Sequence, residues 1–274
     1  MSTGIIEQLN ETVSFIKNIY STNPKIGIVL GSGLGNLAKE IIIEKEISYD
    51  AIPHFPVSTV EGHQGKLIFG KLSGKNVVAM SGRFHYYEGY TAQQVVFPIR
   101  VMKFLGVETL LISNAAGGIN PSFKVGDLMI IKDHISLLVV NPLTGKNCDD
   151  LGVRFPDMSE PYNKQLIAKV KSIATKLNIT LKEGVYAGVT GPTFETRAEY
   201  KFLHFAGGDV VGMSTVQEVI AAVHAGLKVI AMSVITDMGI REEDNIITHE
   251  EVLLAATNAE PKLAAIFKQL ISEL

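Results

Sequence analysis

Residues 82–89 gather three side chains that can bind an anion. The segment reads GRFHYYEG, so Arg83, His85 and Tyr87 occupy alternate positions. In an extended chain, alternate side chains point to the same side. Arginine offers a fork of N–H donors suited to phosphate, and His and Tyr add further hydrogen bonds. The spacing indicates an anion-binding face, and an exposed polar strand face is the alternative.

A second candidate is the glycine-rich turn at residues 31–35 (GSGLG). It directly follows the apolar run 26–30, which is typical of a buried strand. Three glycines in five residues let another group approach the backbone, and Ser32 adds a hydroxyl beside a row of N–H groups. This favours a site for a phosphate-sized anion. A turn without a ligand remains open, as does a dinucleotide fingerprint with Asp50 at the ribose, although Asn36 makes that motif incomplete.

Small or polar residues also follow four other apolar runs. These segments are residues 114–118 (NAAGG), 190–196 (TGPTFET), 212–215 (GMST) and 236–239 (TDMG). In the first, small residues give a ligand access to the backbone and Asn114 can orient it. In the second, Phe194 can stack on a flat ring while Glu195 accepts hydrogen bonds from its edge. Alternatively, Phe194 belongs to the core and Glu195 to the first turn of a helix.

The remaining segments have structural interpretations too. Ser214 with Gln217, or Thr215 with Glu218, matches a capping box, and His249 at the start of the last helix is typical of a surface residue. Taken together, however, at least five apolar strands end in small or polar residues. Ligands of α/β sheets bind at the carboxyl ends of strands. We therefore infer a site for a phosphate-like anion beside a flat polar ligand.

Several other kinds of site lack their motifs. The sequence has no His/Cys/Asp cluster with metal-ligand spacing, no Gly-x-Ser-x-Gly elbow and no Gly-Lys-Ser/Thr phosphate loop. We therefore expect no metal site.

The elements that must position these residues alternate between strand and helix. Hydrophobic periodicity predicts helices at residues 5–20, 91–105, 166–177, 197–205, 216–225 and from the Thr248/Glu251 capping box onward. Strands are predicted at residues 26–30, 66–69, 76–80, 108–112, 127–132, 185–189 and 228–235. Because Ser73-Gly74 also indicates a hairpin, the predicted fold is α/β with a mixed sheet. No linker or repeat interrupts the chain, which predicts one domain over residues 1–274.

Bulk composition narrows the class of protein. The chain has 274 residues, 46% of them hydrophobic, and a net charge of −3, so a sizeable core is expected and nucleic-acid binding is not. Cys148 is the only cysteine, which excludes an intrachain disulfide and suits a reducing compartment. The first twelve residues do not resemble a signal peptide, and no apolar run is long enough to span a membrane. We expect a cytoplasmic globular protein.

With these motifs, the sequence resembles a known family, the trimeric purine nucleoside phosphorylases. The resemblance covers nearly the whole chain and rests on six separated motifs. They lie at residues 31–35, 61–63 (EGH), 82–85, 114–118, 191–196 and 211–215. It implies a partly barrel-like sheet and reversible phosphorolysis, in which a purine nucleoside and phosphate give free purine and ribose 1-phosphate. Phosphate would be a co-substrate, and no metal or organic cofactor would be needed.

The resemblance also implies a role for each matching residue. Phosphate would be held by Ser32, His63, Arg83, His85, Asn114, Ala115 and Ser214. The ribose would be lined by Tyr87, Met213 and His249, and the base by Phe194, Glu195, Val211 and Asp237. Catalysis would involve His85, Glu195 and Asp237. Phe155, in the long loop 141–157, would reach the ribose in a neighbouring subunit's site, which implies a homotrimer.

One departure from the family concerns base choice. The familiar 6-oxopurine enzymes have Asn at the position of Asp237. An ionised Asp237 suits the amino group of adenine, as in the related methylthioadenosine phosphorylases, whereas an ionised Glu195 suits the N1–H of hypoxanthine or guanine. Two carboxylates around one base can share a proton, and a protonated Asp237 would donate to N7 of the leaving base. We expect a 6-oxopurine enzyme with some tolerance for adenosine.

Three alternatives are kept beside this expectation. Asp237 favours a methylthioadenosine or adenosine phosphorylase. A pocket that binds a nucleoside without turnover would indicate a non-catalytic nucleoside-binding protein, and the glycine-rich turn leaves an oxidoreductase open.

Overall fold

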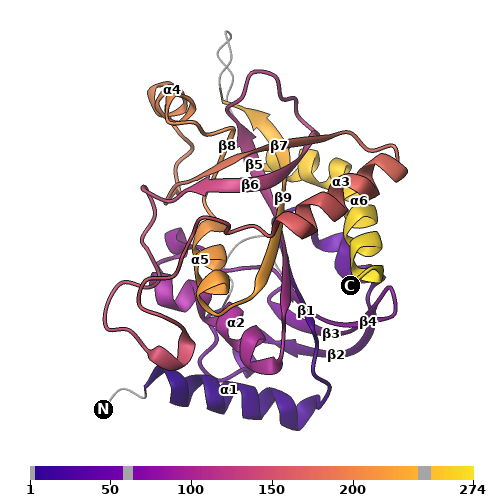
Figure 1. Ribbon diagram of the computed structural model, residues 1–274, viewed down its shortest axis with the longest axis vertical. Coiled ribbons are helices and arrows are strands. Elements are labelled where there is room, and N and C mark those ends of the chain that lie inside the picture. The colour runs from indigo at the N-terminus through magenta and orange to yellow at the C-terminus, as the bar shows by residue number, and fades with distance from the viewer. Residues whose placement is uncertain (1–3, 58–63, 240–247) are drawn as a thin grey trace.

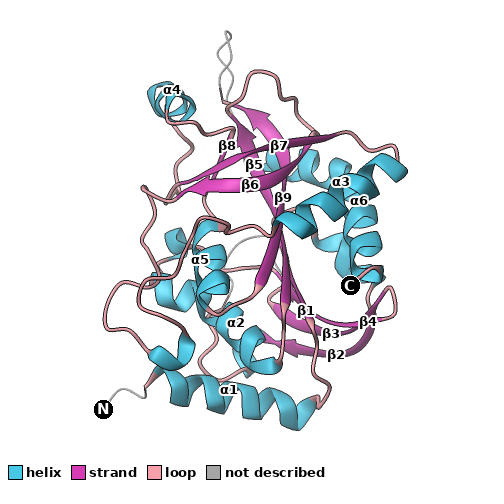
Figure 2. Cartoon of the chain, viewed as in Figure 1, coloured by secondary structure: helices cyan, strands magenta, loops and turns pink. Residues whose placement is uncertain are grey.

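The computed structural model describes residues 4–57, 64–239 and 248–274. In this part of the chain the strands form one mixed sheet flanked by helices (Figures 1 and 2). The strands are β1 (Ile26–Leu30), β2 (Ile42–Ser48), β3 (Lys66–Leu72), β4 (Lys75–Ser81), β5 (Thr109–Gly118), β6 (Leu128–Ile135), β7 (Leu181–Gly188), β8 (Val210–Gly212) and β9 (Lys228–Met238). The α-helices are α1 (Ile5–Ile19), α2 (Ala92–Leu105), α3 (Lys164–Lys176), α4 (Arg197–Phe205), α5 (Val216–His224) and α6 (His249–Ser272).

Part of the sheet closes on itself. Strand β5 pairs with both β8 and β9, and the path through β7 and β6 leads back to β9, so five strands form a ring in the upper half of Figure 1. The β5–β9 pair is parallel, whereas β5–β8 and β6–β9 are antiparallel. The other four strands extend from β5 in the order β1, β4, β3, β2. The predicted mixed, partly barrel-like sheet flanked by helices is confirmed.

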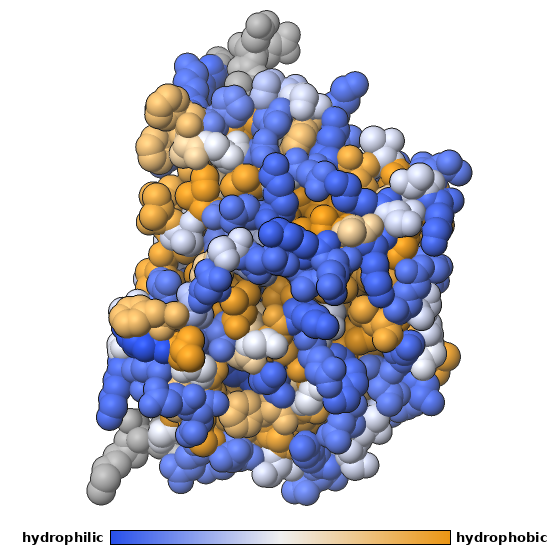
Figure 3. Space-filling view, viewed as in Figure 1, coloured by the Kyte–Doolittle hydropathy of each residue, from blue (hydrophilic) through white to orange (hydrophobic). Residues whose placement is uncertain are grey.

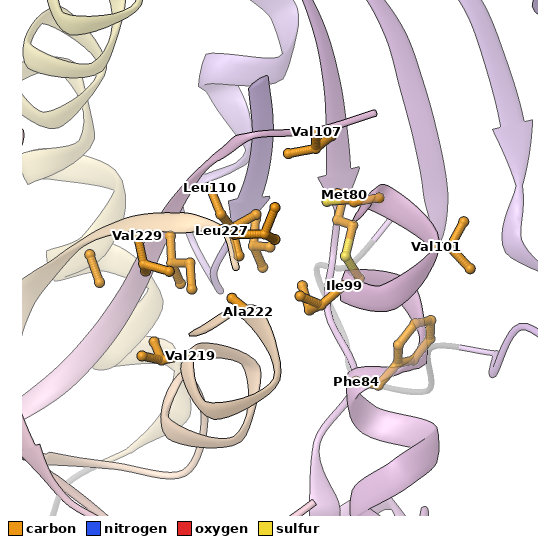
Figure 4. Packing of buried hydrophobic residues seen from close by; sticks show 14 of the residues in the cluster. Met80, Phe84, Ile99, Val101, Val107, Leu110, Val219, Ala222, Leu227 and Val229 are labelled. Carbon is orange, nitrogen blue, oxygen red and sulfur yellow. The ribbon is translucent and has the colours of Figure 1, made fainter. Parts of the chain in front are cut away.

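Apolar side chains cover both faces of the central strands. Strand β1 is buried along its whole length, with Ile26, Ile28 and Leu30 in a cluster shared with α3 and α6. Val29 faces the opposite cluster, shared with α1, α2 and α5. Figure 4 shows part of this second cluster, where Ile99 from α2 and Val219 from α5 approach the sheet. Helices on both faces explain why β1 is a continuous apolar run rather than an alternating one.

Local signals explain most of the element boundaries. Thr248 and Glu251 form the predicted capping box at the start of α6. At the predicted hairpin, Ser73 and Gly74 both have positive φ and join β3 to β4, which is the geometry of a tight two-residue turn. The described helices include none that is both long and apolar enough to cross a membrane.

Two strands run further than predicted. The sequence indicated strand ends at Ile112 and Ile235, but β5 continues to Gly118 and β9 to Met238. The two strands remain paired through Gly117 opposite Asp237, beyond an irregularity at Ala116. Their mutual pairing satisfies backbone groups that a loop would have to satisfy otherwise. Segments 114–118 and 236–238 therefore lie on rigid strands rather than on loops.

Candidate active site

One cavity gathers nearly all the predicted site residues. Its walls come from the turn after β1, the segment after β4, strands β5, β8 and β9, residues 194–200 and the first turn of α6. The lining residues are Ser32, Arg83, His85, Tyr87, Asn114, Ala115, Ala116, Gly117, Phe194, Glu195, Tyr200, Val211, Gly212, Met213, Ser214, Thr236, Asp237, His249 and Val252. Two predicted residues are not among those named. His63 lies outside the described residues, and Phe155 lines a separate cavity beside His134 and Arg154.

Arg83 is fixed by a buried carboxylate. Its side chain is only 1% exposed, and its Nε and Nη2 donate to the two carboxylate oxygens of Glu218 at 3.0 and 2.8 Å. Nη1 donates to the carbonyl of Ser113 at 2.8 Å and to the hydroxyl of Ser214 at 3.3 Å. A bidentate pair of this kind sets the plane of the guanidinium. The nitrogen that also contacts Ser214 is thereby aimed at the cavity.

Ser214 stands at a strained turn before α5. Thr215 has φ 68° and ψ −54°, and the N–H of Val216 donates to the carbonyl of Ser214 at 2.7 Å. These values define a γ-turn of the rare, strained kind. The predicted capping boxes of Ser214 and Thr215 are wrong, because neither side chain caps α5 and Glu218 is bound to Arg83 instead. Backbone strain kept at a cavity wall is typical of functional sites.

Asn114 connects the strained turn to β5. Its Nδ2 donates to the hydroxyl of Thr215 at 2.9 Å, while its Oδ1 is buried with no hydrogen-bond partner among the described residues. The N–H of Ser214 donates to the hydroxyl of Tyr186 at 3.3 Å. An unsatisfied buried acceptor is costly, so a ligand hydroxyl at Asn114 would be stabilising.

His85 is a neutral hydrogen-bonding group at this end of the cavity. Burial lowers its pKa and the charge of Arg83 acts in the same direction, although Glu88 opposes both by accepting from Nδ1 at 3.0 Å. Its ring stacks on Tyr87 with centroids 4.7 Å apart. A neutral imidazole can donate from one nitrogen and accept at the other. Since Glu88 accepts from Nδ1, it fixes the orientation of the His85 ring in the cavity wall.

Ser32 is brought to the same end because β1 and β5 are adjacent. A Cβ on Gly31 would lie 2.7 Å from the carbonyl oxygen of Ser113, so only glycine lets the turn pack on β5. The N–H of Gly31 donates to the hydroxyl of Ser113 at 3.3 Å. This contact places Ser32 beside Asn114 and explains the first glycine of the predicted anion turn.

Another part of the cavity wall carries two carboxylates. Asp237 is 7% exposed, and its Oδ1 accepts from the hydroxyl of Thr236 at 3.0 Å. Glu195 is half-buried and accepts a hydrogen bond from Tyr200. Burial raises the pKa of Glu195, and the negative charge of Asp237 raises it further, against the effect of Tyr200. Phe194, 44% exposed, supplies a ring at the mouth of the cavity.

Tyr87, Met213 and His249 also line the cavity. Gly191, with φ 65°, packs so closely on Met213 that a Cβ there would lie 2.3 Å from the Met213 sulfur and 3.2 Å from the Tyr87 ring. Burial raises the pKa of Tyr87 to about 12, so its hydroxyl stays protonated. His249 is the first residue of α6.

Several residues that shape the site were not predicted from sequence. They are Ser113, Tyr186, Tyr200, Glu218 and Thr236. Glu218 left one signal, because it is a lone acidic residue in the apolar segment 216–223 (VQEVIAAV). A charge that must be buried needs a partner. Among the described residues, no cluster of three or more His, Cys, Asp or Glu side chains could hold a metal ion.

Comparisons with known proteins agree with this geometry. A family model described as "Phosphorylase superfamily" matches residues 25–272. Purine nucleoside phosphorylase 1 of Bacillus subtilis (strain 168) is 49% identical over 267 residues, which cover 97% of this chain and 98% of that protein. A crystal structure of Schistosoma mansoni purine nucleoside phosphorylase in complex with adenosine has a TM-score of 0.93 and 43% identity, covering 98% of each chain. Another crystal structure of Schistosoma mansoni purine nucleoside phosphorylase, in complex with inosine, has a TM-score of 0.92 and 41% identity. The match covers 100% of this chain and 99% of that chain.

The match over nearly all its residues shows that this chain is a phosphorylase-superfamily protein. Within that superfamily it belongs to the purine nucleoside phosphorylases, which are pentosyltransferases. The resemblance found in the sequence is confirmed at this level.

Proposed function

We propose that this chain cleaves ribonucleosides and deoxyribonucleosides of 6-oxopurines with inorganic phosphate, giving free base and (deoxy)ribose 1-phosphate for purine salvage. One observation carries the proposal. A single cavity joins two anion donors, the buried guanidinium of Arg83 and the half-buried hydroxyl of Ser214, to a ring and two carboxylates, Phe194 with Glu195 and Asp237. The donors suit phosphate, and the other end suits a flat base with polar edges.

The proposed reaction uses phosphate as the nucleophile. A phosphate oxygen forms a bond to C1′ of the sugar as the bond from C1′ to the purine nitrogen breaks, leaving its electron pair on the base. The transition state has oxocarbenium character, as in other glycosyl transfers. The chain must therefore align phosphate with C1′ and stabilise charge on the leaving base. Arg83, Ser32 and Ser214 would do the first, and no organic cofactor is required.

The two carboxylates would divide the work at the base. Glu195, in its ionised form, accepts from the N1–H of hypoxanthine or guanine, while a protonated Asp237 donates to N7 as the base leaves. Two like charges so close favour a state with one shared proton. With that proton on Glu195 instead, the site could donate to N1 of adenine. The proposed preference is therefore for 6-oxopurines, with tolerance for adenosine.

We further propose a homotrimer in which Phe155 completes a neighbouring site. Phe155 is 87% exposed and does not line its own chain's active-site cavity. Other apolar side chains are exposed on the same molecule, including Leu137 and Phe205, and Figure 3 shows apolar surface over α4 at the upper left. Light scattering would give the subunit number. Reassembly of Phe155→Ala subunits with Arg83→Ala subunits should restore activity, because some mixed sites combine an intact Arg83 with an intact Phe155.

The primary test of function is base release from inosine and from adenosine, each with and without inorganic phosphate. Phosphate-dependent release, faster from inosine, is the expected result. Release from adenosine or its methylthio derivative alone would move the protein to the adenine branch, and release without phosphate would indicate a hydrolase. Binding without any release would indicate a nucleoside-binding protein.

Cys148 is a free thiol, and we expect the enzyme to work in the reducing cytoplasm.

A further inference from the structure

Helix α6 packs against the glycine-rich turn that contains Ser32. Gly33 has φ 72°, and a Cβ there would lie 2.7 Å from the Ala256 Cβ and 3.1 Å from the carbonyl oxygen of Leu253. The hydroxyl of Thr257 lies 3.5 Å from the carbonyl oxygen of Gly33. The backbone of the turn is thus in direct contact with the helix, with no room for a side chain between them.

A buried carboxylate strengthens this contact one turn further along the helix. Glu260 is 1% exposed; its Oε2 accepts from Nδ2 of Asn36 at 2.6 Å, and its Oε1 accepts from the N–H of Leu37 at 3.0 Å. Both donors lie at the start of the short 3₁₀ helix Gly35–Glu40, whose first N–H groups have no partner within the helix. Burying a carboxylate is costly unless its hydrogen bonds are specific. The position of Glu260 therefore determines where the turn sits.

The same helix also reaches the ribose region of the cavity. His249 and Val252, in its first turn, line the active-site wall. Glu260 lies eleven residues later, or about 16 Å along a helix at 1.5 Å per residue. One helix therefore contacts the glycine-rich turn in its middle and the cavity at its start.

We propose that Glu260 is a positioning residue that couples phosphate binding to nucleoside binding through α6. The inference rests on the proposed function, because it takes the turn at Ser32 as the phosphate side and His249 as the ribose side. Phosphate bound at the turn would fix the position of the turn and, through Glu260, the position of α6. His249 would then lie where it can contact the nucleoside. Linkage makes the effect reciprocal, so that nucleoside also favours phosphate binding.

The test measures this coupling at equilibrium. A C-nucleoside analogue of inosine is suitable, because its carbon–carbon glycosidic bond resists phosphorolysis. Its dissociation constant is measured by calorimetry with and without saturating inorganic phosphate. For the unaltered chain, phosphate should tighten binding of the analogue at least about 5-fold, the lower end of ordinary coupling between sites. In Glu260→Gln the ratio should fall to about one, because the new amide sets an N–H group against the donor of Asn36 or of Leu37. Turning the Asn36 amide to accept that N–H would break the bond in which its Oδ1 accepts from Nζ of Lys39 at 2.6 Å.

A second variant separates this idea from a loss of folding. Asn36→Asp replaces the opposing donor by an acceptor, so the double variant Glu260→Gln with Asn36→Asp restores complementary hydrogen bonds. It should recover most of the coupling ratio. Glu273→Gln, at the exposed end of the same helix, is the matched control and should keep the full ratio. Unfolding midpoints show whether each variant is folded.

Three results would overturn the inference. They are a ratio of one in the unaltered chain, a full ratio in folded Glu260→Gln, and a double variant that is folded but uncoupled. A purely structural Glu260 would lower stability and leave the ratio unchanged. Failure of the proposed function is separable, since it would appear as absence of phosphate-dependent base release from inosine by the unaltered chain.

Discussion

The two ends of the active-site cavity are built differently. At the end proposed to bind phosphate, Arg83 and Asn114 are almost fully buried and are held by partners on other elements, Glu218 and Thr215. At the end proposed to bind the base, Phe194 is 44% exposed, and burial together with the negative charge of Asp237 raises the pKa of Glu195. The first end is buried and strained, whereas the second combines an exposed ring with a carboxylate whose pKa is raised.

This difference corresponds to the two tasks of the site. Phosphate is common to every reaction of the enzyme. The protein groups that bind it can therefore be held in place before it arrives, and the folding free energy offsets the cost of holding them there. The base varies among substrates, and its recognition depends on which protons are present. Changes at the phosphate end should therefore reduce all activity, while changes at the base end should alter preference.

The largest effect should come from Arg83→Lys. A lysine keeps the charge but cannot form the two parallel bonds to Glu218 while also donating to Ser113 and Ser214. We expect kcat/KM for phosphate to fall by about 100-fold or more, a loss of about 3 kcal/mol of transition-state stabilisation, and to fall equally with inosine and adenosine. Steady-state kinetics with both nucleosides is the measurement. A fall confined to one nucleoside would contradict the division between the two ends.

At the base end, Asp237→Asn should change preference more than total activity. A neutral amide removes the second carboxylate, so Glu195 no longer faces a negative neighbour and stays ionised over a wider pH range. The ratio of kcat/KM for inosine to that for adenosine should rise by about 10-fold, or about 1.4 kcal/mol. Glu195→Gln is the matched control and should lower the same ratio. An unchanged ratio in Asp237→Asn would mean that Asp237 does not set base choice.

Preference should also depend on pH, with a smaller effect. Burial raises the pKa of Glu195, so this carboxylate takes up a proton at a higher pH than an ordinary glutamate as the solution is acidified. Protonated Glu195 cannot accept from the N1–H of hypoxanthine. The inosine-to-adenosine ratio of kcat/KM should therefore fall several-fold from about pH 8 to about pH 5.

Using the ratio cancels the titration of phosphate, which both reactions share. The Glu195→Gln variant should show a flat ratio over the same range. A slope that persists in that variant would assign the titration to another group.

Sequence alone could predict the composition of the cavity but not how its residues are held. Arg83 and Glu195 stand in local motifs whose residue types indicate their chemistry. Glu218 does not, because its local spacing with Thr215 matches a capping box. The buried charge of Arg83 decides otherwise, and that pairing joins residues 135 positions apart.

The closure of the sheet was implied by the family resemblance, but hydrophobic periodicity could not predict it, for a similar reason. The ring depends on β9 pairing with both β5 and β6, and strand pairing over such distances leaves no periodic signal. The same pairing carries Asp237 on a strand rather than on a loop. Residue types at a strand end are visible in sequence, but where the strand ends is set by its neighbours.

The smallest predicted effect concerns the strained turn itself. Thr215→Gly removes a strain of about 1–3 kcal/mol, because glycine tolerates positive φ, but it also removes the hydroxyl that accepts from Asn114 at 2.9 Å. The free energy of unfolding should therefore change by no more than about 1 kcal/mol, although Thr215 is 1% exposed. Thr109→Gly, at a buried strand position without strain, should cost about 1–2 kcal/mol and serves as control. Urea unfolding of both variants is the measurement.

With Ser214 less fixed, the KM for phosphate should rise a few-fold in Thr215→Gly while base preference stays constant. A larger loss of stability than in the control would mean that the turn is not strained, and the phosphate end would then be rigid through its hydrogen bonds alone.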